Sequence, residues 1–205
     1  MEIDPQEMPG DRSYRLVVGC VVPRPIAVVS TLSPEGHPNV APFSYFTIAG
    51  HDPLSLTFCV GGPKSKGVEK DTLRNARFPA EGGLGEFIVH VADESYALQI
   101  TRTGEPIPYG ESEFHHAGLT PAPAHSVRPH RIAEAAVAFE CVTTHIVPVG
   151  NAHLVVGRVV HIFVRDDIID DRMQVDPDRL AAIGRMSGND YVRTRDRFEA
   201  RHTAP

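Results

Sequence analysis

Small polar side chains and aromatic rings lie close together in residues 23–46, PRPIAVVSTLSPEGHPNVAPFSYF. The polar groups are three hydroxyls and one amide, from Ser30, Thr31, Ser44 and Asn39. The rings that follow them in sequence are Phe43, Tyr45 and Phe46. Hydroxyl and amide groups beside flat apolar rings suit a planar ligand with a polar edge. The stretch therefore predicts part of a binding site for such a ligand.

Every lysine of the chain lies in one short segment, as Lys64, Lys66 and Lys70, and the other seventeen positive charges are arginine. Asp71 or Thr72 is suited to cap a helix that runs through residue 77. Lysine is unfavourable beside a helix N-terminus, where the dipole is positive, unless an anion binds there. The segment predicts an anion site, and the alternative is a solvated basic loop.

A β-hairpin is expected to hold the first group of residues. Residues 26–32 are apolar and β-branched, residues 33–36 have turn chemistry, and Pro42 forces the residue before it into an extended conformation. Alternation and turn signals predict further strands at 54–60, 86–91, 135–144 and 153–164. Helices are predicted at 71–77, at 94–101 with Asp93 as cap and Ala97, Leu98 and Ile100 for its apolar face, and at 177–183 with Asp176 as cap. Residues 1–12 are expected to form a loose lead-in and residues 185–191 a turn-rich loop, and periodicity leaves 15–22 open between helix and strand. Mostly hairpin-like connections favour a closed antiparallel barrel, which leaves few exposed strand edges.

Composition indicates one domain with a proper core, since the 205 residues are 41% hydrophobic. The net charge of −6 gives no reason to expect a nucleic acid or an acidic membrane as partner. No apolar run reaches 18 residues, and the acidic start MEIDPQEMPGDR is no secretory signal. Three scattered cysteines, Cys20, Cys59 and Cys141, fit a reducing cytoplasm.

Several common site classes lack their motif. The eleven histidines include no His-x-x-x-His or His-Glu-x-x-His, and there is no Cys-x-x-Cys, so no metal site is expected. Gly-x-Gly-x-x-Gly and Walker A loops are absent, which argues against Rossmann and P-loop domains. A Gly-x-Ser-x-Gly elbow is also absent, which argues against a serine hydrolase of that type.

Four segments occur in one order: PRPIAVVST, NVAPFSYF, GG…KDTLRNA and FHHAGLTPAP…RIAEAAVAFEC. In this combination the chain resembles the flavin reductase-like family over residues 12–198, which leaves 1–11 and 199–205 as flexible termini. The resemblance implies a single domain, dominated by β-structure with inserted helices, that folds as an antiparallel Greek-key split β-barrel. It also implies a homodimer, with FMN or in some members FAD bound near the interface.

The resemblance assigns site residues by matching position. Arg24 and the strand end Ser30–Thr31 would line the flavin site. The isoalloxazine and ribityl groups would contact Asn39, Ala41, Phe43 and Ser44. Lys70 and Thr72, with Asp71 between them, would hold the phosphate. No catalytic residue and no metal ligand is assigned, because the flavin itself carries out the redox chemistry.

Two features depart from the family pattern or are left open. Many relatives resemble EFVVN where this chain has EFIVH, so His90 would either touch the ligand or cap a barrel end. The stretch from Gly104 to His130 contains five prolines and four histidines. A loop of this length is usually functional, so it is either a shaped flap beside the flavin or a wrap over one barrel end.

The function that we expect from this reading is an FMN-dependent oxidoreductase. NADH or NADPH would reduce the flavin, and electrons would pass to free flavin, to a monooxygenase or other partner protein, or to a small acceptor. One alternative is a flavoredoxin-like electron carrier. Another is a module that only binds or stores flavin, or a pyridoxamine-phosphate-oxidase-like barrel with a different ligand. Fold alone does not separate these functions.

Overall fold

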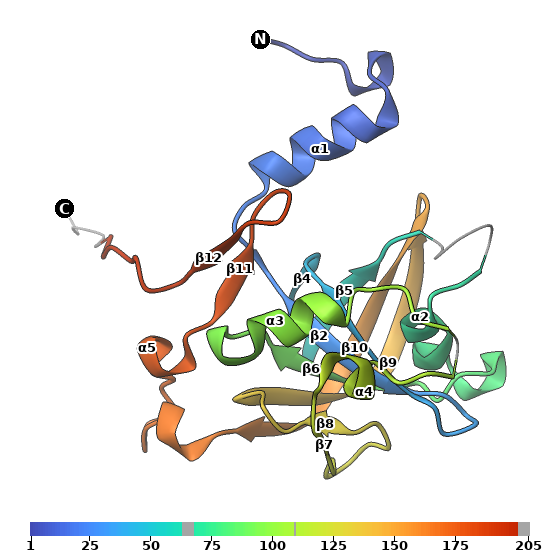
Figure 1. Cartoon of the computed structure of the whole chain (residues 1–205), viewed down its shortest axis with the longest axis vertical. Coiled ribbons are helices and arrows are strands. Elements are labelled where there is room, and N and C mark those ends of the chain that lie inside the picture. Colours follow the sequence, from blue (N-terminus) through green and yellow to red (C-terminus); the bar gives the residue numbers. More distant parts are fainter. Residues whose placement is uncertain (63–67, 109, 201–205) are drawn as a thin grey trace.

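A computed structural model describes residues 1–62, 68–108 and 110–200 (Figure 1). Lys64 and Lys66 lie outside the described residues, so their part in the expected anion site is not described. The body of the molecule is one antiparallel sheet of seven strands with short helices placed along it. Its strands are β2 (Ala27–Leu32), β3 (Pro38–Phe43), β4 (Phe46–His51), β5 (Leu54–Val60), β6 (Glu86–Val91), β9 (Val137–Val149) and β10 (Ala152–Val164).

The strand order is β3-β2-β6-β9-β10-β5-β4, so β2 pairs with β6 and β5 pairs with β10 across long connections. The predicted hairpin at 26–42 is confirmed as β2 and β3, and the other predicted strands are confirmed as β5, β6, β9 and β10. Strand β4 was not predicted. It is an edge strand, and four of its six residues are exposed, so its sequence lacks the apolar alternation of a half-buried strand.

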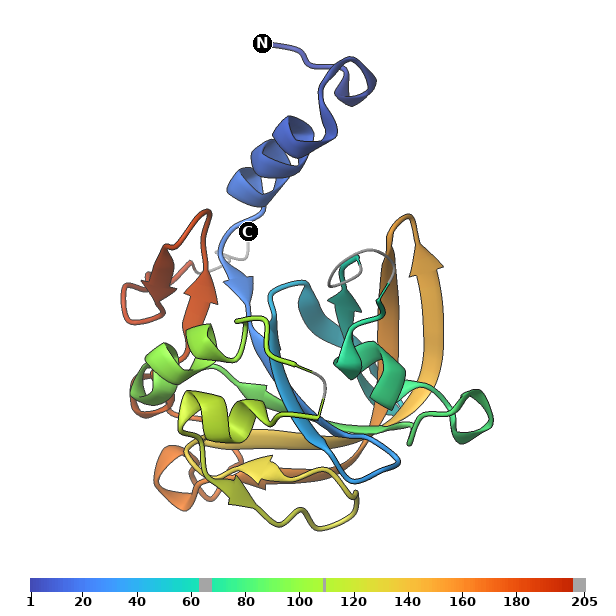
Figure 2. The same ribbon diagram turned by 45° about the vertical axis from the view of Figure 1, so that its right-hand side comes forward.

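Apolar residues of six strands meet in one cluster, which shows that the sheet curls around a common core (Figure 2). This core cluster includes Val29 of β2, Phe43 of β3, Phe58 of β5, Phe87 of β6 and Val155 of β10. The antiparallel architecture is as predicted. Full closure by hydrogen bonds is not found, because no ladder joins the two edge strands β3 and β4 within the described residues.

Two helices, α3 (Ala97–Arg102) and α4 (Glu113–Ala117), contact β3 on the other face of the β2–β3 hairpin. Ile100 and Phe114 of these helices join Val28 in a second buried cluster, so β2 is buried on both faces. The predicted cap Asp93 accepts a hydrogen bond from the Ser95 N–H and begins the 3₁₀ turn η3 (Glu94–Tyr96) that precedes α3. Leu98, expected on the apolar face of this helix, is 76% exposed, so that expectation is wrong.

Helix α2 (Asp71–Ala76) is one turn and a half long. Its N-cap is Lys70, whose side chain makes no capping bond, so the prediction of Asp71 or Thr72 as cap is wrong by one or two positions. Because the helix is short, its dipole contributes little to an anion site. Further along, α5 (Pro177–Leu180) has the predicted cap, Asp176, but ends three residues early, where Ala181 takes a positive φ of 49°.

Helix α1 (Gly10–Cys20) projects from the body in both views (Figures 1 and 2). Of residues 15–22, for which periodicity leaves helix and strand open, residues 15–20 are helical. The predicted loose lead-in is helical from Gly10 onward. None of the residues of α1 is buried, and even the large side chains of Tyr14 and Val17 are exposed. No helix in the described part of the chain combines the length and hydropathy needed to cross a membrane.

A small three-stranded sheet brings together an early segment and a late segment of the chain. It consists of β1 (Arg24–Pro25), β11 (Ile183–Arg185) and β12 (Tyr191–Arg193), in the order β1-β11-β12. The turn-rich loop predicted from residue 185 to residue 191 is therefore the connection of a β-hairpin. The remaining short elements are β7 (Pro121–Ala122), β8 (Arg131–Ile132), η1 (Pro5–Glu7), η2 (Pro79–Glu81) and η4 (Asp166–Ile168).

Carboxylates from the sheet and its flanks hold the second half of the Gly104–His130 stretch. The Glu134 side chain accepts from the Thr120 N–H at 3.0 Å, and buried Glu140 accepts from the His125 N–H at 2.7 Å. Glu86 accepts from the Arg128 N–H at 2.9 Å. Hydrogen bonds to charged acceptors are stronger than neutral ones. This half of the stretch is therefore a fixed wrap over the sheet, which was one of the two expectations.

His90 is a structural residue. Its Nδ1 is 2.9 Å from the Val28 carbonyl oxygen, and its Nε2 accepts from the Ile132 N–H at 2.9 Å. These contacts fix the neutral tautomer with the proton on Nδ1. Complete burial disfavours the imidazolium and lowers the pKa of His90 to about 4. Of the two expectations for His90, contact with a ligand is excluded by its burial.

Candidate functional site

A buried hydrogen-bond network begins where β2 and β3 pair. Thr31 and Asn39 lie directly opposite each other across the two strands. The Asn39 amide donates one N–H to Thr31 Oγ1 at 3.1 Å and the other to Thr72 Oγ1 at 3.0 Å. Asn75, one turn further along α2, donates to the same Thr31 oxygen at 3.0 Å. All four side chains are at most 7% exposed, so the network fixes the start of α2 against β3, and we call it the Thr31 network.

The direction of these bonds matters for ligand binding. Because Thr72 Oγ1 accepts from Asn39, the Thr72 hydroxyl still has its own proton to donate. Within the described residues no acceptor is found for that proton. Thr72 also lines a cavity, so the network presents an O–H donor to whatever occupies that cavity.

That cavity, which we call the Lys70 cavity, has a volume of about 360 Å³. Strand β3, the start of α2, the segment after α3 and α4 supply its wall: Asn39, Ala41, Pro42, Phe43, Gly62, Lys70, Asp71, Thr72, Thr103, Gly104, Glu105, Pro106 and Glu113. Six of the ten sequence-predicted site residues lie in it. The first residues of the Gly104–His130 stretch form its rim, in contrast to the fixed second half.

The Lys70 cavity contains one lysine and three carboxylates, Asp71, Glu105 and Glu113. Asp71 lies 3.5 Å from the guanidinium of Arg74, and buried Glu113 accepts from the Val40 N–H at 3.2 Å. Glu105 lies 2.7 Å from His116 Nε2, so all three carboxylates have partners of their own. Lys70 and the Thr72 hydroxyl are the lining side chains whose hydrogen-bond donors suit an anion.

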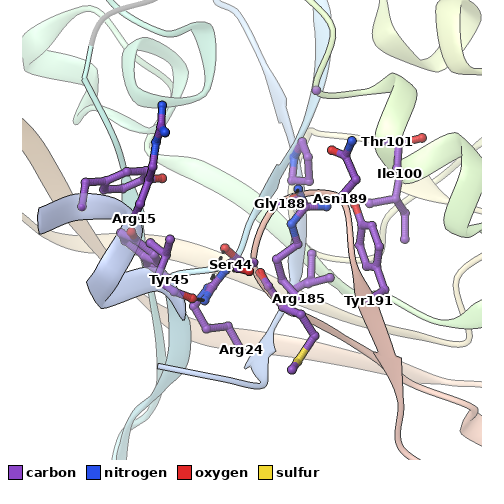
Figure 3. Close-up of a pocket in the computed structure, with 17 residues that line it drawn as sticks. Arg15, Arg24, Ser44, Tyr45, Ile100, Thr101, Arg185, Gly188, Asn189 and Tyr191 are labelled. Atoms are coloured by element: carbon purple, nitrogen blue, oxygen red, sulfur yellow. Dashed lines mark hydrogen bonds between the residues drawn. The ribbon is translucent and has the colours of Figure 1, made fainter. Parts of the chain in front are cut away.

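A second and larger cavity, of about 600 Å³, adjoins the first, and Pro42 and Gly104 belong to both walls (Figure 3). We call it the arginine cavity because Arg15, Arg24 and Arg185 line it and no aspartate or glutamate does. Figure 3 shows Arg15 and Tyr45 on one side, Arg185 and Tyr191 on the other, and Arg24 with Ser44 between them. Two further predicted residues, Arg24 and Ser44, thus lie here.

Arg24 ties three elements together. Its guanidinium donates to the Val18 and Val21 carbonyls at the end of α1, at 2.6 and 2.7 Å, and to the Met186 carbonyl at 2.7 Å. Its Nε donates to Ser44 Oγ at 3.3 Å. Arg24 is 7% exposed and all these acceptors are uncharged. The residue therefore has a structural role in addition to its place in the cavity wall.

Ser30 and Thr31 were predicted together, but the structure separates them. Successive side chains of a strand point to opposite faces, and Ser30 shares the face of Val28. Its hydroxyl donates to the His130 carbonyl at 2.7 Å and it lines neither cavity. Thr31 lies on the opposite face of β2, the face of Val29 and the core cluster. It does not line the Lys70 cavity, but it positions Asn39, which does.

Sequence reasoning did not single out Asn75, Glu113 or Arg185. Asn75 stands inside the segment KDTLRNA, but only the packing of α2 on β2 shows that its amide reaches Thr31. Glu113 and Arg185 fell in stretches predicted as loops, where a charged residue gives no signal. Within residues 1–62, 68–108 and 110–200, no group of three or more histidine, cysteine, aspartate or glutamate side chains is placed to hold a metal ion.

The chain is similar to known proteins in sequence and in fold. The family model for the flavin reductase like domain matches residues 18–184. The crystal structure of nitrilotriacetate monooxygenase component B from Bacillus cereus is similar at 33% identity and TM-score 0.90, over 98% of both chains. A 2-nitrobenzoate 2-nitroreductase of Pseudomonas fluorescens is similar at 31% identity and TM-score 0.86, over 100% of this chain and 96% of that one.

A split-barrel structure from Shewanella frigidimarina shares the fold at 14% identity and TM-score 0.79, covering 98% of this chain and 99% of that chain. The antiparallel split-barrel architecture expected from the sequence is thereby confirmed. The match of the family model spans most of the 205 residues, from the end of α1 to β11. The chain therefore belongs to the flavin reductase-like family.

Proposed function

We propose that this protein is an FMN-binding oxidoreductase in which NADH or NADPH reduces the flavin. The observation that carries the proposal is the Thr31 network, which orients the Thr72 hydroxyl as a donor beside Lys70 in the Lys70 cavity. A flavin, when bound, accepts a hydride and passes electrons on. The protein supplies anchoring and orientation, and no side chain needs to act as general acid or base.

The lining fits a flavin mononucleotide from its phosphate inward. A phosphomonoester carries a charge of about −1.5 to −2 at neutral pH and accepts several hydrogen bonds. Lys70 and Thr72 would hold that group. Lys70 would donate from a charged ammonium on a flexible side chain, and Thr72 from a neutral hydroxyl that the network holds in place. The ribityl chain and ring would then lie along the stretch from Ala41 to Ser44, where the two cavities share Pro42. FAD remains the alternative flavin.

The rim of the Lys70 cavity is where we place access for the electron donor. Gly104, Glu105 and Pro106 border the cavity, whereas the later part of the same stretch is held by carboxylates. One similar protein is named as a component of a monooxygenase and another as a nitroreductase. A monooxygenase partner or a small organic acceptor would therefore be suitable electron acceptors here.

We further propose a homodimer and a cytoplasmic location. Helix α1 has 11 residues, exposes Tyr14 and Val17, and buries none of its side chains in its own chain. An isolated helix of that length is marginal in water, so a second copy is a suitable support. Light scattering of a dilute sample should give twice the chain mass, and a flavin-loaded monomer would exclude the dimer. All three cysteines are free, which agrees with a reducing compartment.

The anchoring claim is tested by Lys70→Ala with FMN and riboflavin as ligands. Loss of a charge-assisted contact should weaken FMN binding by about 1.5–3 kcal/mol and change riboflavin binding much less. Arg158→Ala is the control, because it also removes one positive charge and Arg158 is an exposed residue of β10 that lines neither cavity. Equal weakening of both ligands by Lys70→Ala would show that Lys70 does not meet the phosphate.

The reductase claim is tested by visible spectroscopy under anaerobic conditions. FMN-loaded protein should bleach on addition of NADH or NADPH. A flavin that stays oxidised with both nucleotides, but is reduced by a reduced redox protein, would identify the electron-carrier alternative. Flavin that is bound and reduced by neither would identify a storage protein. Protein that does not take up FMN would contradict the proposal as a whole.

A further inference from the structure

The arginine cavity holds positive charge that its own wall does not balance. Arg24 donates only to carbonyls and to one hydroxyl, and Arg185 donates to the Gly188 carbonyl. No carboxylate in the described residues pairs with either guanidinium. Arg15 has Asp11 at 3.8 Å, but both side chains are more than 60% exposed, so that pair is weak.

This arrangement is unusual in a chain whose net charge is −6. Charged groups are rarely buried without an opposite charge, because the lost hydration is not recovered. Arg24 is 7% exposed and has no such partner. The potential of the cavity is therefore positive, and an anion that enters it would supply the missing countercharge.

Three tyrosines, Tyr14, Tyr45 and Tyr191, provide flat apolar surface in the same wall. The Arg185 guanidinium lies 4.6 Å from the centre of the Tyr191 ring, which holds it in place. Burial and a hydrogen bond to Tyr14 raise the pKa of Tyr45, so this phenol stays neutral and cannot balance the arginines. The wall thus combines fixed cationic groups with aromatic faces.

We propose that the arginine cavity is a second anion site, separate from the flavin phosphate site. It takes the carboxylate or phosphate of the aromatic molecule that exchanges electrons with the flavin. Arg185 is the contact residue, since most of the Arg24 donors are already engaged, and Arg24 contributes charge. That the ligand exchanges electrons rests on the proposed function, whereas the binding of an aromatic anion does not.

The test is calorimetric titration of the full-length protein, with and without FMN, using two probes. Benzoate represents an aromatic carboxylate and ADP a nucleotide phosphate. At least one should bind, and raising NaCl from about 50 to about 300 mM should weaken it, because exposed charge is screened. Arg185→Gln should weaken that probe about tenfold or more, since a charged bidentate donor is lost. Arg185→Lys, which keeps the charge, should lose less.

Arg158→Gln is the control, because Arg158 is an exposed arginine on β10 that lines neither cavity. Its probe binding should equal that of the parent protein. Binding of benzoate alone identifies a carboxylate ligand, and binding of ADP alone a nucleotide. Binding of neither probe, equal loss in Arg158→Gln, or an equal loss of FMN affinity in Arg185→Gln would overturn the proposal. Probe binding by protein that takes up no FMN would contradict the proposed function and leave the anion site standing.

Discussion

The walls of the two adjoining cavities differ in their balance of positive and negative side chains. In the Lys70 cavity one lysine faces three carboxylates, and the Thr72 hydroxyl is aimed by a network that reaches into the core. In the arginine cavity three cationic side chains have no carboxylate in the wall. The proposed binding of phosphate in the first cavity would therefore depend on the geometry of a few donors. The proposed binding of an anion in the second would depend on net charge, which is less selective and more sensitive to salt.

The largest effect should come from Arg24→Ala, which tests whether the cavities are independent. The change leaves the carbonyls of Val18, Val21 and Met186 without their donor, so we expect the free energy of unfolding to fall by about 3 kcal/mol. Urea unfolding measures this loss. Arg24→Lys should recover part of it, because an ammonium has donors but not the planar fork.

The ratio of FMN to riboflavin affinity in the Arg24→Ala variant shows whether the two cavities act independently. We expect the preference for FMN to survive, because the Thr31 network and Lys70 do not contact Arg24. If the preference disappears while the protein is still folded by circular dichroism, the two cavities are one unit and the contrast between them is wrong.

A smaller effect is expected from Thr31→Val, which keeps the shape of the side chain and removes its oxygen. Asn39 and Asn75 then each lose an acceptor, and we expect a loss of about 2 kcal/mol in stability together with weaker FMN binding. Ser30→Ala is the matched control on the opposite face of β2. It should lower stability by about 1 kcal/mol and leave FMN affinity unchanged. Equal FMN affinity in both variants would contradict the positioning role of Thr31.

A loss of stability similar to that in Thr31→Val, and tied to neither cavity, is expected from protonation of His90 in β6, the strand that pairs with β2. Its pKa in the folded protein is about 4, below the unfolded value, so the unfolded chain takes up the proton first as pH falls. Stability is thus lost as pH falls from about 6.5 toward 4. We expect a loss of about 2 kcal/mol between pH 7 and pH 5. His90→Gln, which does not titrate, should flatten this dependence in urea unfolding, and an unchanged slope would assign it to other groups.

Much of the fold was predictable because strand periodicity is local. Strand β5 alternates strictly and was predicted with its correct bounds, residues 54–60. Lys70 lines one cavity with Asn39, Ala41 and Phe43, and their assignment to the flavin through the family resemblance remains a prediction. The residue bounds 12–198 of the single domain remain a prediction.

The predictions that failed concern residues whose roles depend on contacts between distant parts of the chain. Thr31 and Ser30 are adjacent in sequence, and only the burial of β2 on both faces shows that they serve different neighbours. Leu98 is apolar but lies on the solvent side of α3. Arg185 could not be identified as a cavity residue from the sequence, because it reaches the cavity wall by pairing with Arg24 in the small sheet.

The bond from Arg24 to the Met186 carbonyl joins residues 162 positions apart, and this has a consequence for synthesis of the protein on the ribosome. The residues of the Thr31 network are all translated by residue 75, whereas the arginine cavity lacks one wall until the hairpin β11–β12 has emerged. Chains emerge at about 5–20 residues per second, so the Arg24 guanidinium waits roughly 8 to 32 seconds for the Met186 carbonyl. During that interval Arg24 can bind only the carbonyls of α1 and its neighbours in sequence. A chain truncated before residue 183 would keep the Thr31 network and the bonds from Arg24 to α1, but it would lack the Met186 carbonyl and with it the far wall of the arginine cavity.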